Sequence, residues 1–176
     1  MDINKIPTGK NPPVDLNVII EIPQNADPVK YEVDKESGAV FVDRFVHTPM
    51  FYPVNYGFVP HTLSEDGDPV DVMVLAPFPV VVGSVLRARP IGVLLMEDES
   101  GRDEKILAVP HTKMHPYYDH ITDYSQLPPI QLHQIEHFFT HYKDLEKGKW
   151  VKVTGWADAK EAEKLVVEGI ARAAKK

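Results

Sequence analysis

The sequence predicts an α+β fold in a single domain spanning residues 1–176. Short runs of β-branched and aromatic residues fill the first two-thirds of the chain, whereas two patterns of helical period follow in the last third. Proline and glycine separate the runs, which is typical of a closed or partly closed barrel rather than a parallel sheet. With 43% hydrophobic residues, the chain can form one proper core.

Strands are expected wherever these apolar runs occur. The expected strands are 18–22, 29–33, 39–42, 70–75, 84–89, 91–96 and 106–109. Gly38 turns the chain between the second and third, so these two should form a hairpin. Lys30 and Glu32 share one face of the second strand, and Glu21 interrupts the otherwise apolar first strand. Charges at these positions indicate either a cleft or simply an exposed strand face.

Two helices are expected after the strands. The first runs from about 128 to 145, and the second begins after Asp158, a good N-cap with Glu161 three residues later. The apolar stripe of the first helix comprises Ile135, Phe138, Phe139, Tyr142 and Leu145. The residues that the second helix should bury are Leu165, Val166 and Ile170.

Composition restricts the partners and the location of the protein. A net charge of −7 argues against a nucleic-acid partner. The longest apolar stretch, 70–86, is interrupted by an aspartate, two prolines and a glycine, which argues against a membrane span. The N-terminus lacks the apolar core of a signal peptide, and the chain has no cysteine. A cytoplasmic protein is therefore expected.

The most informative segment is Asp-Gly-Asp-Pro-Val-Asp-Val at 66–72, which holds Asp66, Asp68 and Asp71. Carboxylates this close repel one another unless cations lie between them, so the segment indicates a site for a hard metal ion. Gly67 and Pro69 break the strand pleat, so that a turn can direct all three carboxylates to one place. A solvated acidic loop is the alternative.

A second acidic cluster begins at Glu97-Asp98-Glu99 and continues past Gly101 to Asp103 and Lys105. The strands on either side suggest a hairpin that brings Asp98 and Asp103 together at its tip. A charged surface turn would give the same pattern.

Cations and phenols accompany these carboxylates. Arg44 precedes Tyr52 and Tyr56, and Tyr142 is followed directly by Lys143. Such donors opposite bound metal ions suggest a substrate with many anionic oxygens. Tyrosines that serve only in core packing are the alternative.

These residues carry a family resemblance. From Gly9-Lys10 to Lys149-Trp150 the sequence resembles the soluble family I inorganic pyrophosphatases of bacterial type. Segment 66–72 corresponds to the family signature, and segment 52–57, Asp98, Asp103 and Tyr142-Lys143 stand where the family has them.

The resemblance implies a five-stranded OB-like β-barrel with flanking hairpins and two helices, and a site in the barrel mouth. It also implies Mg²⁺-dependent hydrolysis of pyrophosphate to two phosphates. In this reaction a metal-activated water attacks directly and in line, without a covalent intermediate. Several Mg²⁺ ions are expected per site, with Mn²⁺ or Zn²⁺ able to substitute. The implied assembly is a homohexamer, a dimer of trimers, with no nucleic-acid or membrane partner.

The resemblance further implies roles for individual residues. The implied metal ligands are Asp66, Asp71, Asp98 and Asp103, with Asp71 shared between two ions. The implied ligands of phosphate oxygens are Lys30, Arg44, Tyr56, Tyr142 and Lys143. Asp68 is the implied general base. The supporting residues are Glu21, Glu32, Tyr52 and Lys105.

Other interpretations fit less of the sequence. Segment 66–70 matches the D-x-D-x-V loop of aspartate-based phosphohydrolases, but the βα alternation and the preceding buried strand of that class are missing. An EF-hand would need a glutamate where Pro77 stands. A nucleic-acid-binding barrel would need a basic mouth, whereas this mouth is expected to be acidic.

A histidine row suggests zinc at first sight. Segment 133–137 matches H-x-x-E-H, and His141 extends the row. The row lies opposite the apolar stripe of its helix, which places it at the solvent or at another subunit. We therefore expect a subunit interface that weakens as the imidazoles protonate, at about pH 6.

Overall fold

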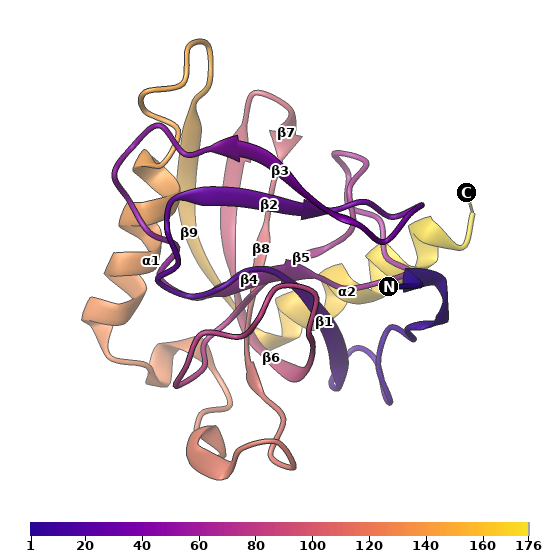
Figure 1. Ribbon diagram of the computed structural model, residues 1–176. Coiled ribbons are helices and arrows are strands. Elements are labelled where there is room, and N and C mark those ends of the chain that lie inside the picture. The colour runs from indigo at the N-terminus through magenta and orange to yellow at the C-terminus, as the bar shows by residue number, and fades with distance from the viewer. Residues whose placement is uncertain (176) are drawn as a thin grey trace.

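The computed structural model describes residues 1–175 and consists of a strongly bent sheet, a separate hairpin and two helices (Figure 1). The strands are β1 (Leu16–Ile22), β2 (Val29–Val33), β3 (Val40–Phe45), β4 (Asn55–Phe58), β5 (Asp71–Val74), β6 (Val85–Asp98), β7 (Gly101–Arg102), β8 (Lys105–Pro110) and β9 (Val151–Asp158). The helices are α1 (Pro129–His141) and α2 (Ala159–Ala173), with short 3₁₀ turns at Ile3–Lys5, Pro116–Tyr118 and Tyr124–Gln126.

Five strands pair in a ring. β1 pairs with β4, β4 with β5, β5 with β8, β8 with β6, and β6 again with β1. Only the β5–β8 pair is parallel. The predicted α+β fold, with five strands at its centre and two helices, is confirmed. The five central strands form a ring-like sheet that is not formally a barrel. The ring closes because β6, with 14 residues, is long enough to pair with β1 near its start and with β8 further on.

The two strands predicted at 84–89 and 91–96 are in fact one strand. β6 runs through Pro90 without ending, with a register shift between Pro90 and Gly92. Proline lacks an N–H group, and an irregularity of this kind is where a strand tolerates it. The sequence interpretation also missed β4, β7 and β9, of which β9 separates the two helices.

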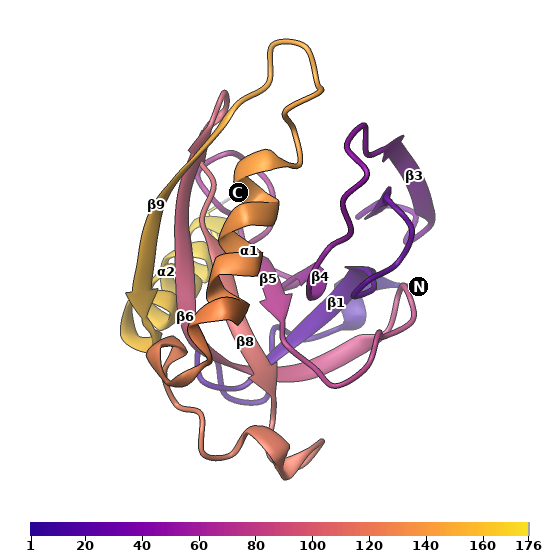
Figure 2. The same cartoon turned by 90° about the vertical axis from the view of Figure 1, so that its left-hand side faces the viewer.

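β2 and β3 form the predicted hairpin as a sheet of their own. Lys30 lies opposite Arg44 in the register of the two strands, and this register shifts between Lys30 and Tyr31. This irregularity breaks the strict alternation predicted for the strand. Figure 2 shows the hairpin on the opposite side of the open end of the ring from the loop between α1 and β9.

The helices cover the sheet from two sides, each over its own apolar cluster. α1 buries Ile135, Phe138 and Phe139, and the following Tyr142 is also buried. The helix ends at His141, earlier than predicted, and the chain then turns so that Leu145 is 63% exposed. The prediction that Leu145 belongs to the apolar stripe is therefore wrong.

α2 begins as predicted. The carboxylate of Asp158 accepts a hydrogen bond from the N–H of Glu161 at 3.0 Å. Val166 is buried, whereas Leu165 and Ile170 are only partly buried against the same cluster. No helix within residues 1–175 is long and apolar enough to cross a membrane.

Candidate active site

One pocket of about 270 Å³ is lined by every residue that the sequence assigned to the site. These residues are Glu21, Lys30, Glu32, Arg44, Tyr52, Tyr56, Asp66, Asp68, Asp71, Asp98, Asp103, Lys105, Tyr142 and Lys143. They come from the ring strands, from loops that precede or join these strands, from the β2–β3 hairpin and from the end of α1. The fold therefore brings the two acidic segments and the cations to a single place.

Asp66 and Asp68 lie in the loop between β4 and β5, residues 59–70, which we call the aspartate loop. Gly67 has a φ of +97°, a conformation that favours glycine, so the turn depends on this residue. The N–H of Asp68 donates to the carboxylate of Asp66 at 3.0 Å. Asp71 follows as the first residue of β5. All three carboxylates line the pocket, as the glycine and proline of this segment suggested.

Lys105 lies among the carboxylates. Its ammonium group is 2.5 Å from the carboxylate of Asp71 and also contacts Asp103. Burial lowers the pKa of Lys105, but the two carboxylates more than offset this and raise its pKa well above the ordinary value. Lys105 therefore carries a positive charge, and it occupies part of the space between two predicted metal ligands.

The carboxyl groups of Asp66 and Asp103 both have raised pKa values. Burial is the main cause for each, and the charge of Asp71 adds to it in both cases. Their acidity is thus coupled through space, as expected of carboxylates that face one pocket.

The tip of the β6–β7 hairpin supplies Asp98, in the hairpin that the second acidic cluster predicted. Asp98 lies 2.7 Å from the ammonium group of Lys143, and both residues are buried. Burial raises the pKa of Asp98, but Lys143 and the N–H of Ser100 together bring it below its ordinary value. The neighbouring Glu99 pairs with Lys149.

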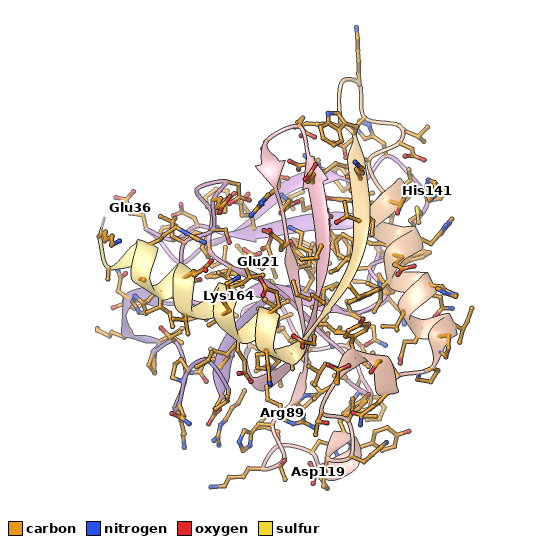
Figure 3. The ribbon with its side chains drawn as sticks, turned by 180° about the vertical axis from the view of Figure 1, so that it is seen from behind. Glu21, Glu36, Arg89, Asp119, His141 and Lys164 are labelled. Carbon is orange, nitrogen blue, oxygen red and sulfur yellow. The ribbon has the colours of Figure 1, made fainter. Side chains whose placement is uncertain are left out.

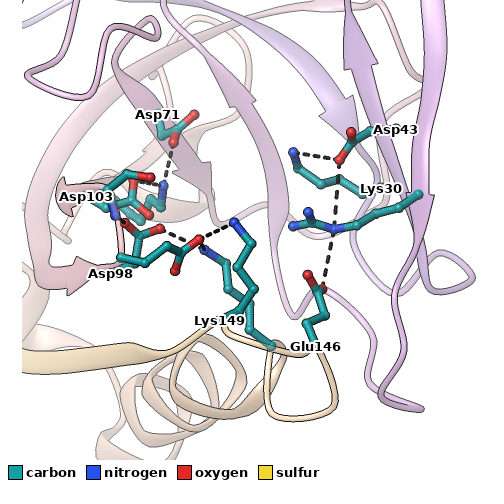
Figure 4. A network of polar contacts seen from close by, with 12 residues as sticks. Lys30, Asp43, Asp71, Asp98, Asp103, Glu146 and Lys149 are labelled. Carbon is teal, nitrogen blue, oxygen red and sulfur yellow. Dashed lines mark hydrogen bonds and ion pairs between the residues drawn. The ribbon is translucent and has the colours of Figure 1, made fainter.

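Figure 4 shows a second group of charges on the β2–β3 hairpin, facing the carboxylates. Lys30 lies 3.0 Å from Asp43, and Arg44 lies 3.4 Å from Glu146. Each of these cations is partly exposed and has an acidic partner that an anionic ligand could replace. This side of the pocket can therefore bind phosphate oxygens.

Three tyrosines form an aromatic wall of the pocket. The ring centroids of Tyr52 and Tyr56 are 5.3 Å apart, and those of Tyr52 and Tyr142 are 6.3 Å apart. Burial raises the pKa of all three phenols, so they remain protonated donors at neutral pH. They pack in the core and line the pocket at the same time, so the two interpretations of these tyrosines are compatible.

Glu21 and Glu32 support the hairpin. Glu21 is buried and accepts a hydrogen bond from the N–H of Val33 at 2.8 Å, which ties β2 to β1. Burial raises the pKa of Glu21 to about 7. Glu32 pairs with Lys35 at 3.4 Å. Figure 3 shows Glu21 inside the molecule and Glu36, from the β2–β3 turn, at its rim.

Sequence reasoning assigned no role in the site to several lining residues, among them Lys35, Lys149 and Glu99, although Glu99 belongs to the second acidic cluster. Lys149 follows Lys147 and Gly148 and looks like part of an ordinary charged turn. Its partner Glu99 stands far away in the sequence, so spacing alone could not have found this pair.

The donor set fits hard divalent cations. Asp66, Asp71, Asp98 and Asp103 offer only carboxylate oxygens, which Mg²⁺ prefers. Within residues 1–175 no group of three acidic or imidazole side chains is arranged to hold an ion directly, and the Lys105 ammonium group lies between two of the carboxylates. An ion in this pocket would therefore compete with Lys105 for Asp71 and Asp103.

The histidine row does not reach this pocket. His133 and His137 are exposed, and His141 lies at the outer end of α1 (Figure 3). The rings of His137 and His141 are 4.6 Å apart, while Glu136 instead accepts a hydrogen bond from the Trp156 indole at 2.6 Å. The row therefore faces away from the core, as its helical spacing predicted.

Comparison with known proteins gives consistent results. The family model described as inorganic pyrophosphatase matches residues 18–174. The chain is 70% identical to the inorganic pyrophosphatase of Rhodospirillum rubrum over 171 residues, covering 97% of this chain and 96% of the relative. It is 62% identical to that of Caulobacter vibrioides, covering 98% and 97%.

Solved structures are similar as well. The crystal structure of inorganic pyrophosphatase from Thermus thermophilus superimposes with a TM-score of 0.93 at 43% identity, covering 99% of both chains. The inorganic phosphatase of Anaplasma phagocytophilum superimposes with a TM-score of 0.95 at 53% identity, covering 98% of this chain and 100% of that one.

Proposed function

The chain belongs to the soluble family I inorganic pyrophosphatases and hydrolyses inorganic pyrophosphate, and we propose how its pocket does so. In this proposal the whole chain acts as one catalytic domain. The reaction depends on Mg²⁺, and water attacks one phosphorus atom in line with the departing phosphate. No covalent intermediate forms with the protein.

The observation that supports this mechanism is the division of charge across the pocket. Carboxylates of the aspartate loop and the β6–β7 hairpin lie on one side, in contact with two lysines. Lys30 and Arg44 lie on the other side, each beside one acidic partner (Figure 4). Pyrophosphate resists hydrolysis because its anionic oxygens repel a nucleophile and its phosphate leaves poorly. Both barriers are electrostatic, so positioning and fixed charge should supply most of the catalysis.

The proposed metal ligands are Asp66, Asp71, Asp98 and Asp103. When bound, divalent cations would make a water molecule more acidic and neutralise phosphate oxygens. Several Mg²⁺ ions per site are proposed, with Mn²⁺ or Zn²⁺ able to replace them. The carboxylates would then exchange their ion pairs with Lys105 and Lys143 for ion contacts.

Asp68 is the proposed general base. Within residues 1–175 no ion pair engages its carboxylate, whereas Asp71, Asp98 and Asp103 are all paired with lysines. Asp68 is exposed at the pocket wall, so water can reach it. A carboxylate that holds no cation can accept the proton of the attacking water or orient that water.

The cations and phenols are the proposed substrate ligands. Lys30, Arg44 and Lys143 would leave Asp43, Glu146 and Asp98 to bind phosphate oxygens. The list of substrate ligands is completed by Tyr56 and Tyr142, which remain neutral donors. The proposed supporting residues, which also line the pocket, are Glu21, Glu32, Tyr52 and Lys105.

We also propose that the chain assembles as a homohexamer, a dimer of trimers. A hollow of about 860 Å³ beside α1 is lined by His133 and His137 together with the exposed Phe51 and Ile130, so an apolar and titratable surface is available. The assembly should weaken as these imidazoles protonate. Sedimentation that gave one assembly size from pH 5 to pH 8 would contradict the pH dependence.

A cytoplasmic location, with no nucleic-acid or membrane partner, belongs to the same proposal. Syntheses that consume nucleoside triphosphates release pyrophosphate in that compartment, and its hydrolysis would pull them forward. Fractionation of cells tests the location directly.

The experiment that tests the proposed mechanism is phosphate release from pyrophosphate and from a panel of phosphate monoesters, with Mg²⁺ titrated from zero. We expect hydrolysis of pyrophosphate only, and a rate that depends on Mg²⁺ with more than one binding step. Equal turnover in excess chelator would contradict the metal dependence.

A further inference from the structure

The aspartate loop closes at its neck through a buried hydroxyl group. Beyond the last β4–β5 pair, the N–H of Val59 donates to the carbonyl of Val70 at 3.0 Å. The return bond is not direct. The N–H of Val70 donates to Oγ1 of Thr62 at 2.9 Å, and this hydroxyl donates to the carbonyl of Val59 at 2.6 Å. Two paired residues of an antiparallel sheet normally exchange two direct N–H···O bonds. Here the Thr62 hydroxyl group bridges the second of these bonds, from the N–H of Val70 to the carbonyl of Val59.

The properties of Thr62 suit this place. The residue is 5% exposed, so water has little access to replace its hydrogen bonds. A hydroxyl can donate and accept at once, and here it satisfies one backbone donor and one backbone acceptor. Without it, the N–H of Val70 and the carbonyl of Val59 would lose their partners, or the two segments would close on each other. Either change would move the neck of the aspartate loop.

Helix α2 holds the loop just beyond the neck. The N–H of Leu63 donates to the carbonyl of Gly169 at 3.0 Å, and the guanidinium group of Arg172 donates to the carbonyl of Leu63 at 3.3 Å. A Cβ atom at Gly169 would lie 2.6 Å from a methyl group of Val70, so the helix and the loop are in close contact there. The loop is therefore fixed at its neck and along its side.

These contacts continue to the catalytic tip. The N–H of Ser64 donates to the carbonyl of Asp68 at 2.6 Å, and the N–H of Asp68 donates to the carboxylate of Asp66 at 3.0 Å. Hydrogen bonds from three consecutive residues, Thr62, Leu63 and Ser64, thus hold the loop up to the backbone of Asp68, whose N–H in turn binds the carboxylate of Asp66.

We propose that Thr62 is a positioning residue for pyrophosphate hydrolysis, and that its hydroxyl sets the position of Asp66 and Asp68. The inference rests on the proposed function, in which these two carboxylates serve as metal ligand and general base. Thr62 itself does not line the pocket, so it would act only through the loop. Catalysis is sensitive to such shifts, because a displacement of about 1 Å can cost on the order of 100-fold in rate.

The test compares Thr62→Val, which keeps the shape but removes the hydroxyl, with Thr62→Ser, which keeps the hydroxyl. Thr140→Val is the matched control, since its hydroxyl donates to the carbonyl of Glu136 at 2.7 Å on α1, outside the pocket lining. We expect Thr62→Val to lower kcat by about tenfold and to raise the Mg²⁺ concentration for half-maximal activity severalfold. For Thr62→Ser and for Thr140→Val, both quantities should stay within about twofold of those of the parent protein.

Kinetics below the unfolding transition separate positioning from stability. A wild-type kcat and Mg²⁺ dependence in folded Thr62→Val, or an equal loss in Thr62→Ser, would overturn the inference. If Thr62→Val does not fold, Thr62→Cys must show the same direction of loss, because a thiol is a weaker donor and acceptor. The parent protein and Asp68→Asn test the proposed function separately, since neither alters Thr62.

Discussion

The ammonium group of Lys105 lies 2.5 Å from the carboxylate of Asp71, at a position where Lys105 is only 3% exposed. It contacts Asp103 as well. A single internal cation thus offsets part of the charge of two carboxylates that we expect to bind Mg²⁺. The lysine therefore reduces the electrostatic repulsion among the acids of the pocket.

Replacing Lys105 should make folding depend on metal. Lys105→Met removes a buried partner, and such losses cost about 3–5 kcal/mol because the remaining charge is uncompensated. We expect a large drop in Tm in excess chelator and recovery of most of it in saturating Mg²⁺. Thermal melts of both proteins under both conditions measure this. A Mg²⁺-induced shift no larger than that of the parent protein would show that lysine and metal do not share the site.

Asp68→Asn should retain Mg²⁺ binding and lose most turnover. The amide keeps the size of the carboxylate but cannot accept a proton, and general-base contributions are typically about 100- to 10,000-fold. Phosphate release at saturating Mg²⁺ and calorimetric Mg²⁺ titration give the two quantities. Glu65→Gln, in the same exposed loop, is the control and should remain active. Near-native hydrolysis by Asp68→Asn would refute the assignment of the base.

Lys143→Ala should mainly raise KM, by about tenfold or more, since a charge-assisted hydrogen bond to a phosphate oxygen contributes roughly 1.5–3 kcal/mol. It should also lower stability, because it leaves the buried Asp98 without its partner at 2.7 Å. Steady-state kinetics with pyrophosphate measure the first effect. Lys147→Ala, at an exposed position of the same turn, should leave kinetics unchanged. Unaltered kinetics in Lys143→Ala would remove this residue from the substrate site.

Glu21 should make the metal-free protein less stable as pH rises. Its pKa is raised from 4.5 to about 7 by burial, so the native state binds more protons than the unfolded state between these values. Stability should therefore fall across this window, by roughly 3 kcal/mol at 1.36 kcal/mol per pKa unit. Glu21→Gln keeps an acceptor for the N–H of Val33 but does not titrate.

Urea unfolding in excess chelator, from pH 4.5 to pH 8, tests this expectation. Glu21→Gln should match the parent protein near pH 4.5 and exceed its stability above pH 7. Glu36→Gln, at an exposed position of the β2–β3 turn, should follow the parent curve. Parallel curves for Glu21→Gln and the parent would mean that Glu21 is not the group that titrates.

The features that could be predicted from the sequence are those that depend on residues close together in the chain. The turn at Gly67, the hairpin that presents Asp98, and the cap at Asp158 were predictable because each is a local pattern of a few residues. The continuous β6 was not, since Pro90 normally ends a strand and only its neighbours in the ring keep it in place.

Ion pairs between residues far apart in the sequence could not be predicted either, because they depend on the closed ring. Arg44 meets Glu146, and Lys149 meets Glu99, only after the ring closes and brings distant segments together. Leu145 was misassigned because the helical period continues in the sequence past His141, where the backbone leaves the helix.

The central claim is that the carboxylates of two separate turns bind divalent ions in one pocket. Anomalous diffraction from crystals grown with Mn²⁺ tests it most directly. We predict peaks within about 2.6 Å of carboxylate oxygens of Asp71 and Asp103, with the ammonium group of Lys105 displaced from between them. Crystals saturated with Mn²⁺ that show no peak in this pocket, and Lys105 still paired with both aspartates, would contradict it.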